Sequence, residues 1–129
     1  MSEYILDASA LIAMLRSEPG ADRVSKTISD ARMSVINYSE VVSYFVHAGM
    51  DARDIDAMLD PLPIEWVLVD KQLANLAGRL RKSTASAGLS LGDRFCIALA
   101  KRDGLAAWTA DKGWKAIESD VGVEVVIIR

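Results

Sequence analysis

Four acidic residues stand where a predicted strand has just ended or a predicted helix begins: Asp7, Glu40, Asp93 and Asp111. Ionised carboxylates that share a cleft repel one another, which raises some of their pKa values. A set of oxygen ligands suits the hard cations Mg²⁺ and Mn²⁺, and a cation of this kind relieves the repulsion. A metal ion held by carboxylates can activate water and stabilise the charge that builds on a phosphodiester during in-line attack. If the four acids converge, phosphodiester hydrolysis is the chemistry they would serve best.

Each acid also has a purely structural explanation. Asp7 and Asp111 stand at positions of helix N-caps, and Asn37-x-x-Glu40 and Ser90-x-x-Asp93 resemble capping boxes. A cap stabilises a helix by about 1 kcal/mol, and the helix dipole also favours an acid in the first turn. Capping explains the acids one at a time but not four acids gathered at one edge. A non-catalytic binding module, in which the acids only cap helices, stays an alternative.

The elements that must position these acids alternate along the chain. Strands are predicted at residues 4–6, 33–36, 64–69, 105–109 and 123–128, and helices at 8–15, 21–30, 37–46, 52–59, 71–82, 93–102 and 112–118. Helical crossovers of this length join parallel strands, so we predict an α/β fold, a three-layer α/β/α sandwich around a parallel sheet of about five strands. In such sheets ligands bind beyond the carboxyl ends of the strands, which is where the acids fall.

Length and composition narrow the function further. A chain of 129 residues, 51% of them hydrophobic, fits a single domain over residues 1–129. One cysteine, Cys96, and one histidine, His47, exclude an internal disulfide and zinc sites built on several such residues. The formal net charge of -3 disfavours a nucleic-acid binder on charge alone. Setting the four acids aside as one metal site moves that balance to +1. No signal peptide or membrane span is evident, so we expect a cytoplasmic protein.

The motifs around the four acids resemble those of PIN domains. The first lies in Ile5-Leu6-Asp7-Ala8-Ser9-Ala10-Leu11 and the second in Asn37-Tyr38-Ser39-Glu40-Val41. The third lies in Leu89-Ser90-Leu91-Gly92-Asp93-Arg94 and the residues up to Ala100, and the fourth in Trp108-Thr109-Ala110-Asp111. Their order and spacing agree with the family over essentially the whole chain. The size and the L-S-L-G-D-R stretch most resemble the VapC toxins of type II toxin–antitoxin systems.

That resemblance implies an endoribonuclease that depends on Mg²⁺ or Mn²⁺, is usually a homodimer, and is inhibited by a VapB-like antitoxin. It implies that the metal ligands and catalytic acids are Asp7, Glu40, Asp93 and Asp111, the last often acting through water. Ser9 and Thr109 match positions that support the site by hydrogen bonding, and Asn37 lies beside them at the same edge. Among basic residues, Arg94, Lys112 and Lys115 are the preferred candidates for phosphate contacts.

Other enzyme classes fit the sequence less well. Gly88-Leu89-Ser90-Leu91-Gly92 matches the G-x-S-x-G nucleophile elbow, but a polar loop precedes it and the only histidine lies upstream. A haloacid-dehalogenase-type phosphatase needs a second aspartate two residues after the first, where Ser9 stands. A receiver domain needs an acidic pair near the end of the first strand, and Glu3 precedes that strand. A Mg²⁺-dependent phosphatase or receiver-like domain is therefore the weaker alternative.

Overall fold

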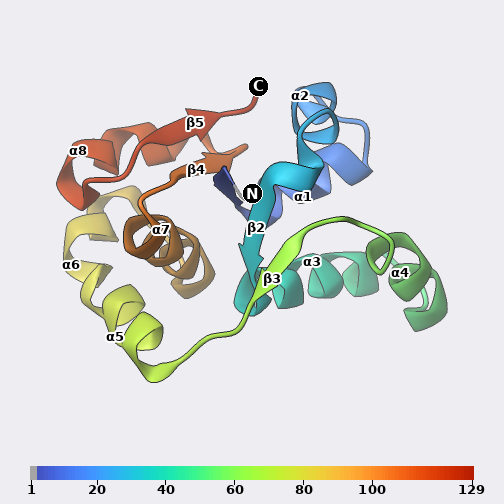
Figure 1. Ribbon diagram of the computed structural model, residues 1–129, viewed down its shortest axis with the longest axis horizontal. Coiled ribbons are helices and arrows are strands. Elements are labelled where there is room, and N and C mark those ends of the chain that lie inside the picture. Colours follow the sequence, from blue (N-terminus) through green and yellow to red (C-terminus); the bar gives the residue numbers. More distant parts are fainter. Residues whose placement is uncertain (1–2) are drawn as a thin grey trace.

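A computed structural model describes residues 3–129, in which helices cover both faces of a parallel β-sheet (Figure 1). The elements follow in the order β1 (Tyr4–Leu6), α1 (Ala8–Leu15), α2 (Ala21–Ser25), η1 (Ile28–Asp30), β2 (Ala31–Ser34), α3 (Val35–His47), α4 (Ala52–Leu59), β3 (Glu65–Val67), α5 (Lys71–Arg79), α6 (Arg81–Thr84), η2 (Ala85–Ala87), α7 (Leu91–Asp103), β4 (Ala106–Thr109), η3 (Lys112–Ile117), α8 (Glu118–Val121) and β5 (Val125–Ile127). Within the described residues, five strands form one sheet in the order β3-β2-β1-β4-β5, and their pairings are parallel.

The hydrophobic core is divided by the sheet into two layers. Helices α1, α2, α3 and α4 pack on one face, and α5, α7 and the segment from η3 to α8 pack on the other (Figure 1). The neighbouring β1 residues Ile5 and Leu6 are both fully buried, and they belong to opposite layers. A central parallel strand is apolar on both sides for this reason. The predicted three-layer α/β/α sandwich is confirmed.

The start of α3 differs from the sequence prediction. We expected Asn37 to cap a helix that begins there, whereas α3 begins at Val35 and its N-cap is Ser34. The Ser34 backbone is extended, and its hydroxyl accepts a hydrogen bond from the Asn37 N–H at 3.2 Å. The expected Asn37 cap is therefore wrong. Because Ser34 caps the helix, Asn37 lies inside its first turn, fully buried.

Two predicted helices are shorter than expected. The stretch 71–82 ends as α5 at Arg79, and α6 and the turn η2 follow it as separate short pieces. The stretch 21–30 ends as a helix at Ser25 and finishes as the 3₁₀ turn η1. The predictions 8–15 and 52–59 agree with α1 and α4 at both ends.

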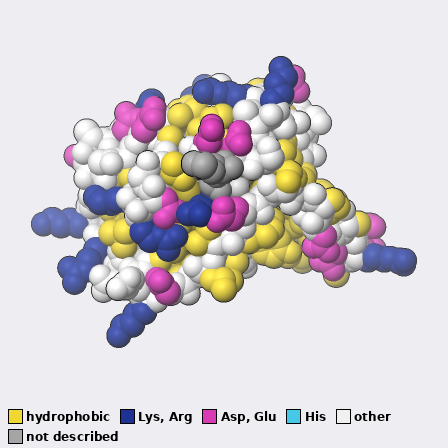
Figure 2. All heavy atoms as spheres, viewed as in Figure 1, with side chains coloured by type: hydrophobic (Ala, Val, Ile, Leu, Met, Phe, Trp, Pro, Cys, Tyr) yellow, Lys and Arg dark blue, Asp and Glu magenta, His cyan; other side chains and the backbone are white. Residues whose placement is uncertain are grey.

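On the face seen in Figure 2, charges of both signs are mixed. Lys and Arg side chains lie at its margin and nearer its middle, interspersed with Asp and Glu, so this face presents no continuous basic field. Within residues 3–129, no helix is long and apolar enough to cross a bilayer.

Candidate metal and active site

The candidate site lies where the path of the chain through the sheet reverses. From the central strand β1 the chain passes to β2 and then β3 on one side, and afterwards to β4 and β5 on the other. Strands β1 and β4 are neighbours, with Leu6 opposite Trp108, so Asp7 and Thr109 lie side by side at the carboxyl edge. Such a switch point is where open α/β sheets bind ligands.

Asp7 is the most buried of the four acids, at 3% exposed. One carboxylate oxygen, Oδ2, accepts hydrogen bonds from the Ser9 hydroxyl at 2.6 Å and from the Thr109 hydroxyl at 3.0 Å. Oδ2 also accepts a longer bond from the Ser9 N–H at 3.4 Å, which makes Asp7 the N-cap of α1. Among the described residues no group donates to the other oxygen, Oδ1, although it is buried.

The two hydroxyls around Asp7 are themselves held by the turn after β4. The Ser9 oxygen accepts from the Ala110 N–H at 3.0 Å, and the Thr109 oxygen accepts from the Asp111 N–H at 3.1 Å. Each hydroxyl therefore has its proton directed to Asp7 and its lone pair engaged by backbone. The orientation of Asp7 is fixed by α1 and β4 together.

Burial raises the pKa of the Asp7 carboxyl to about 7. The hydrogen bonds from Ser9 and Thr109 lower this pKa, and the nearby carboxylates of Asp93 and Glu40 raise it again. None of these contributions comes from a basic residue. Asp7 is thus a carboxylate that lacks a compensating positive charge, and this is the condition in which a bound cation stabilises the ionised form.

Glu40 reaches the cleft from α3 and is held by Asn37. The Asn37 side-chain N–H₂ donates to Glu40 Oε1 at 2.7 Å and to the Gly92 carbonyl oxygen at 2.9 Å, so it joins α3 to α7. The Asn37 oxygen accepts in turn from the Ser34 hydroxyl at 2.8 Å. Burial raises the pKa of Glu40; its Asn37 hydrogen bond lowers that pKa, and the Asp93 charge raises it.

Asp93 comes from the first turn of α7. Its Oδ2 accepts from the Ser90 N–H at 2.9 Å, and the Ser90 hydroxyl accepts from the Asp93 N–H at 3.2 Å. The predicted capping box is therefore confirmed. Asp93 nevertheless lines one cleft of about 630 Å³ with Asp7 and Glu40, so the cap does not remove it from the acidic group.

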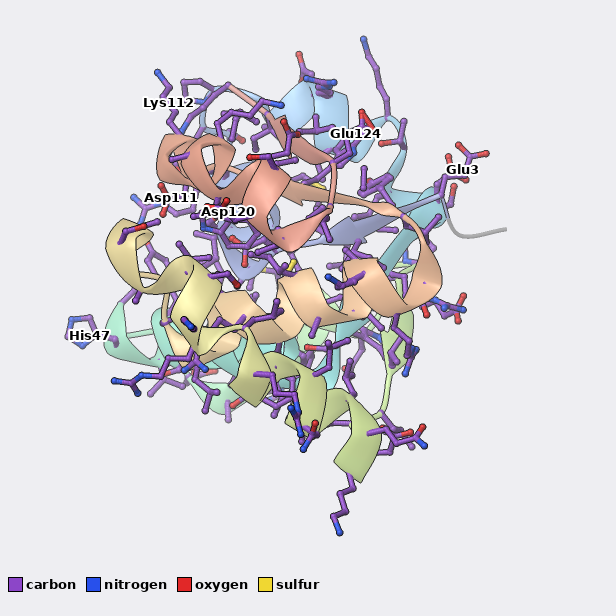
Figure 3. The ribbon with its side chains drawn as sticks, turned by 90° about the vertical axis from the view of Figure 1, so that its left-hand side faces the viewer. Glu3, His47, Asp111, Lys112, Asp120 and Glu124 are labelled. Carbon is purple, nitrogen blue, oxygen red and sulfur yellow. The ribbon has the colours of Figure 1, made fainter. Side chains whose placement is uncertain are left out.

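Asp111 lies apart from the other three acids. Its side chain is exposed and accepts from the Gly113 N–H at 2.9 Å, as the N-cap of η3. It lines a smaller cavity of about 370 Å³, which meets the acidic cleft at Ser9. Figure 3 shows Asp111 and Lys112 on the side of the molecule where His47 also lies, with Glu3 on the opposite side. The structure thus brings three acids together and places the fourth beside them.

The basic candidates are distributed differently from the prediction. Lys112 is exposed and lines the smaller cavity. Lys115 is engaged elsewhere, because its ammonium donates to the Val125 carbonyl at 2.6 Å and to Glu118 at 3.1 Å. Arg94 is buried and donates to the Ala77 carbonyl of α5 at 3.2 Å. In this arrangement Arg94 and Lys115 are not directed to a phosphate, and Lys112 stays available.

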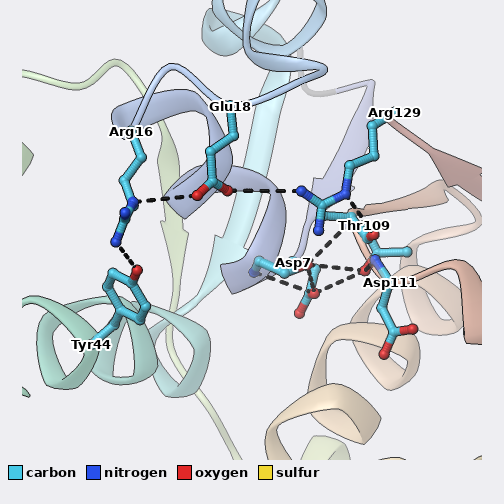
Figure 4. Close-up of polar contacts among 9 residues, drawn as sticks. Asp7, Arg16, Glu18, Tyr44, Thr109, Asp111 and Arg129 are labelled. Carbon is cyan, nitrogen blue, oxygen red and sulfur yellow. Dashed lines mark hydrogen bonds and ion pairs between the residues drawn. The ribbon is translucent and has the colours of Figure 1, made fainter.

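Several residues near the acids were not identified from the sequence. Ser43 and Tyr44 line the acidic cleft, together with the exposed His47. They follow Glu40 on α3 at spacings of three, four and seven residues. Residues at these spacings share one face of a helix, so the helical periodicity from Glu40 could have identified them. Arg129 lines the smaller cavity. Figure 4 shows its guanidinium near Asp7 and Thr109. Ion pairs join it through Glu18 to Arg16, whose guanidinium donates a hydrogen bond to the Tyr44 hydroxyl.

The donor set fits a divalent cation. Across residues 3–129, no three His, Cys, Asp or Glu side chains are close enough to hold a metal ion as they stand. Three carboxylates nevertheless line one cleft, and one buried oxygen of Asp7 receives no hydrogen bond from the described residues. An all-oxygen set of this kind matches the preference of Mg²⁺ and Mn²⁺. Residues Asp7, Glu40 and Asp93 would hold such an ion.

Comparison with known proteins identifies the family of this chain. The PIN domain family model matches residues 4–119. A protein named ribonuclease VapC from Mycolicibacterium smegmatis is 34% identical over 111 residues, which are 78% of this chain and 84% of that protein. Similar folds are found in DNA-bound VapBC from Salmonella typhimurium, with a TM-score of 0.76, 20% identity and 98% of both chains covered. FitAcB from Neisseria gonorrhoeae matches with a TM-score of 0.68, 19% identity and 95% coverage of each chain.

The predicted resemblance is therefore confirmed by a family match over nearly the whole chain and by a relative of more than 30% identity. The protein belongs to the PIN domain family, as a relative of VapC.

Proposed function

We propose that this protein is a Mg²⁺- or Mn²⁺-dependent endoribonuclease that hydrolyses phosphodiester bonds of RNA. The observation that carries the proposal is the convergence of Asp7, Glu40 and Asp93 on one cleft, where Asp7 keeps one buried oxygen without a hydrogen-bond donor. The relative from Mycolicibacterium smegmatis is named a ribonuclease, which supports the choice of RNA as substrate.

The roles of the residues follow from their contacts. Ser9 and Thr109 hold one oxygen of Asp7 and leave the other, buried oxygen without a hydrogen-bond donor. Glu40 is oriented by Asn37, and Asp93 by the first turn of α7. When bound, the divalent cation supplies positive charge for the phosphodiester oxygens and lowers the pKa of water. Asp111, across Ser9 from the other acids, would orient the attacking water.

A toxin role with a protein inhibitor is part of this proposal. Solved relatives of the same fold are described as VapBC and other toxin–antitoxin complexes, some of them bound to DNA. An acidic cleft attracts a basic side chain, so a VapB-like antitoxin could occupy it with an Arg or Lys residue in place of the cation. A homodimer and a cytoplasmic location remain predictions from the family resemblance and from the sequence.

Incubation of the purified protein with structured RNA tests the enzymatic proposal. We expect cleavage with Mg²⁺ or Mn²⁺, none in EDTA, and none with Asp7→Asn or Asp93→Asn. Asp51→Asn is a matched control, because Asp51 is the exposed N-cap of α4 and Asn caps a helix equally well. Circular dichroism would verify that the variants fold. RNA cleavage that persists in EDTA and in both acid variants would exclude the proposal.

The main alternative is a non-catalytic binding module. Three of the acids, Asp7, Asp93 and Asp111, do cap helices in the structure, which is the observation in its favour. Isothermal titration with Mn²⁺ separates the two: a binding heat that disappears in Asp93→Asn supports the enzyme, and its absence in the unmodified protein supports the module.

A further inference from the structure

A second cavity adjoins the acidic cleft and has a different charge. It measures about 370 Å³ and is lined by Ser9, Ala110, Asp111, Lys112 and Arg129. Ser9 also lines the acidic cleft, so the two cavities meet at this residue. An extended chain that crosses the acidic cleft would continue over Ser9 into the second cavity. Its lining has two basic residues against one carboxylate, that of Asp111, whereas the acidic cleft has three carboxylates.

The position of Arg129 is fixed by the edge of the sheet. The preceding residue, Ile128, donates its N–H to the Thr109 carbonyl at 3.0 Å, which extends the pairing of β5 with β4. The Arg129 Nε then donates to the Ala110 carbonyl at 3.3 Å. The guanidinium is thus anchored through Nε beside the turn that holds Ser9 and Asp111.

Most of the hydrogen-bonding capacity of this guanidinium is still available. Its ion pair with Glu18 is long, at 3.8 Å, and both side chains are more than a third exposed. An exposed ion pair of this kind contributes little, so a better anion displaces it at small cost. A guanidinium with a free pair of terminal N–H₂ groups binds a phosphate with two parallel hydrogen bonds.

Lys112 supplies a second positive charge on the same cavity. Its side chain is exposed, and no hydrogen bond or ion pair of its ammonium is found among residues 3–129. Lys115, three residues later, is held by Val125 and Glu118. Of the two lysines of η3, Lys112 is therefore the one whose ammonium is available to contact a bound anion.

We propose that Arg129 and Lys112 form a phosphate-binding subsite for the nucleotide next to the bond that is cut. The inference rests on the proposed ribonuclease function, and it names the side on which the RNA strand continues, namely from the acidic cleft over Ser9. A polyanion needs such contacts here because the cleft itself is acidic. Contacts to phosphates position a strand without reading its sequence.

The test measures RNA binding separately from cleavage. Fluorescence anisotropy in EDTA, with the Asp7→Asn protein and a labelled mixed-sequence single-stranded RNA, gives the dissociation constant at several salt concentrations. The double variant Arg129→Gln/Lys112→Gln is expected to bind at least about tenfold more weakly, because two charge-assisted contacts are lost. The slope of log affinity against log salt should fall by about 0.7 for each contact. Arg129→Lys should keep the slope and lose part of the affinity, because it keeps the charge without the paired hydrogen bonds.

The control removes the same charge elsewhere. Lys26→Gln/Arg53→Gln changes two exposed residues, one after α2 and one in α4, that line neither cavity. This pair should leave the affinity within about twofold. In the active protein, the Arg129 and Lys112 changes should raise KM and leave kcat within about twofold.

The possible failures are distinguishable. If the unmodified protein cuts no RNA with either metal, the proposed function fails, whatever the anisotropy shows. If it cuts RNA but the Arg129 and Lys112 variant binds as the control does, the subsite is wrong. Equal losses in the variant and the control would mean general attraction by charge, which also overturns the subsite.

Discussion

Gly92 lies directly against the carboxylate of Glu40: a Cβ atom at residue 92 would stand 2.1 Å from Glu40 Oε2 and 2.4 Å from its Cδ. Gly92 belongs to α7 and Glu40 to α3, so the absence of a side chain allows the two helices to bring Glu40 and Asp93 to one cleft. Asn37 strengthens the same contact by donating to both residues. A glycine at this position is needed for close approach and not for an unusual backbone angle.

We predict that Gly92→Ala lowers kcat/KM for RNA by about a hundredfold, because Glu40 must move away from its partners. Gly78→Ala is the matched control: Gly78 is also helical, is exposed, and has open space where a Cβ would be. It should keep full activity and gain up to about 1 kcal/mol of stability from helix propensity. Steady-state kinetics and urea unfolding check both. Unchanged kinetics in Gly92→Ala would contradict the proposed importance of the Glu40 position.

The second prediction concerns the stability of the metal-free protein as a function of pH. The pKa of Asp7 is raised from 3.8 to about 7, so between these values the folded state binds a proton that the unfolded state has lost. The stability that this proton confers is fully present below pH 3.8 and is lost as the pH rises to about 7. The loss is on the order of 4 kcal/mol.

Asp7→Asn removes this titration. In EDTA, its free energy of unfolding relative to the unmodified protein should therefore rise between pH 4 and pH 7 and level off above. Urea unfolding followed by circular dichroism at several pH values measures the difference. The exposed control Asp51→Asn should show no such trend. If the difference between Asp7→Asn and the unmodified protein is constant with pH, Asp7 is not the buried acid described here.

Removal of the hydroxyl groups around Asp7 should weaken metal binding. Ser9→Ala and Thr109→Val each delete a hydrogen bond that lowers the pKa of Asp7, so the pKa should rise further. We expect Mn²⁺ affinity at pH 7 to fall about tenfold or more, which is typical when a partner of a metal ligand is lost. Part of the loss should be recovered at pH 8.5, where Asp7 ionises. Calorimetry measures both, and Thr84→Ala, a buried threonine bonded to Leu80, serves as control.

The sequence and the structure lead to different expectations for Arg94. As a neighbour of Asp93 it was a candidate for phosphate contact, but its guanidinium donates to Ala77, and among the described residues its buried Nε has no partner. We predict that Arg94→Met leaves KM within about twofold, while stability changes little or rises, since replacing a poorly compensated buried charge is often neutral. A rise in KM of tenfold would restore Arg94 as a phosphate contact.

The fold could be predicted from the sequence because its signals are local. The run Tyr4–Leu6 ends at an acid, and the alternation of strands and helices is enough to predict a parallel sheet with that acid at its carboxyl edge. Helix boundaries were less predictable. Asn37 and Ser34 are both good N-caps, and only the extended backbone of Ser34 decides between them.

The site could be predicted only in part, because some of its geometry comes from contacts between distant residues. Asp93 and Arg94 are adjacent in sequence, yet one turns to the cleft and the other to α5, since successive helical residues differ by about 100°. The Lys115 ammonium is held by a carbonyl of β5. Arg129 joins the site through the pairing of β5 with β4, which no local pattern around residue 129 indicates.

The hydrogen bond from Thr109 to Asp7 spans 102 residues of sequence, so it can form only late in the synthesis of the chain. Asp7, Glu40 and Asp93 come from separate parts of the chain, and Asp7 is oriented only when β4 has paired with β1. A ribosome-bound chain that has not yet released residue 109 therefore has the first acids but no ordered site. The complete site therefore forms only after residue 109 has left the ribosome and β4 has paired with β1.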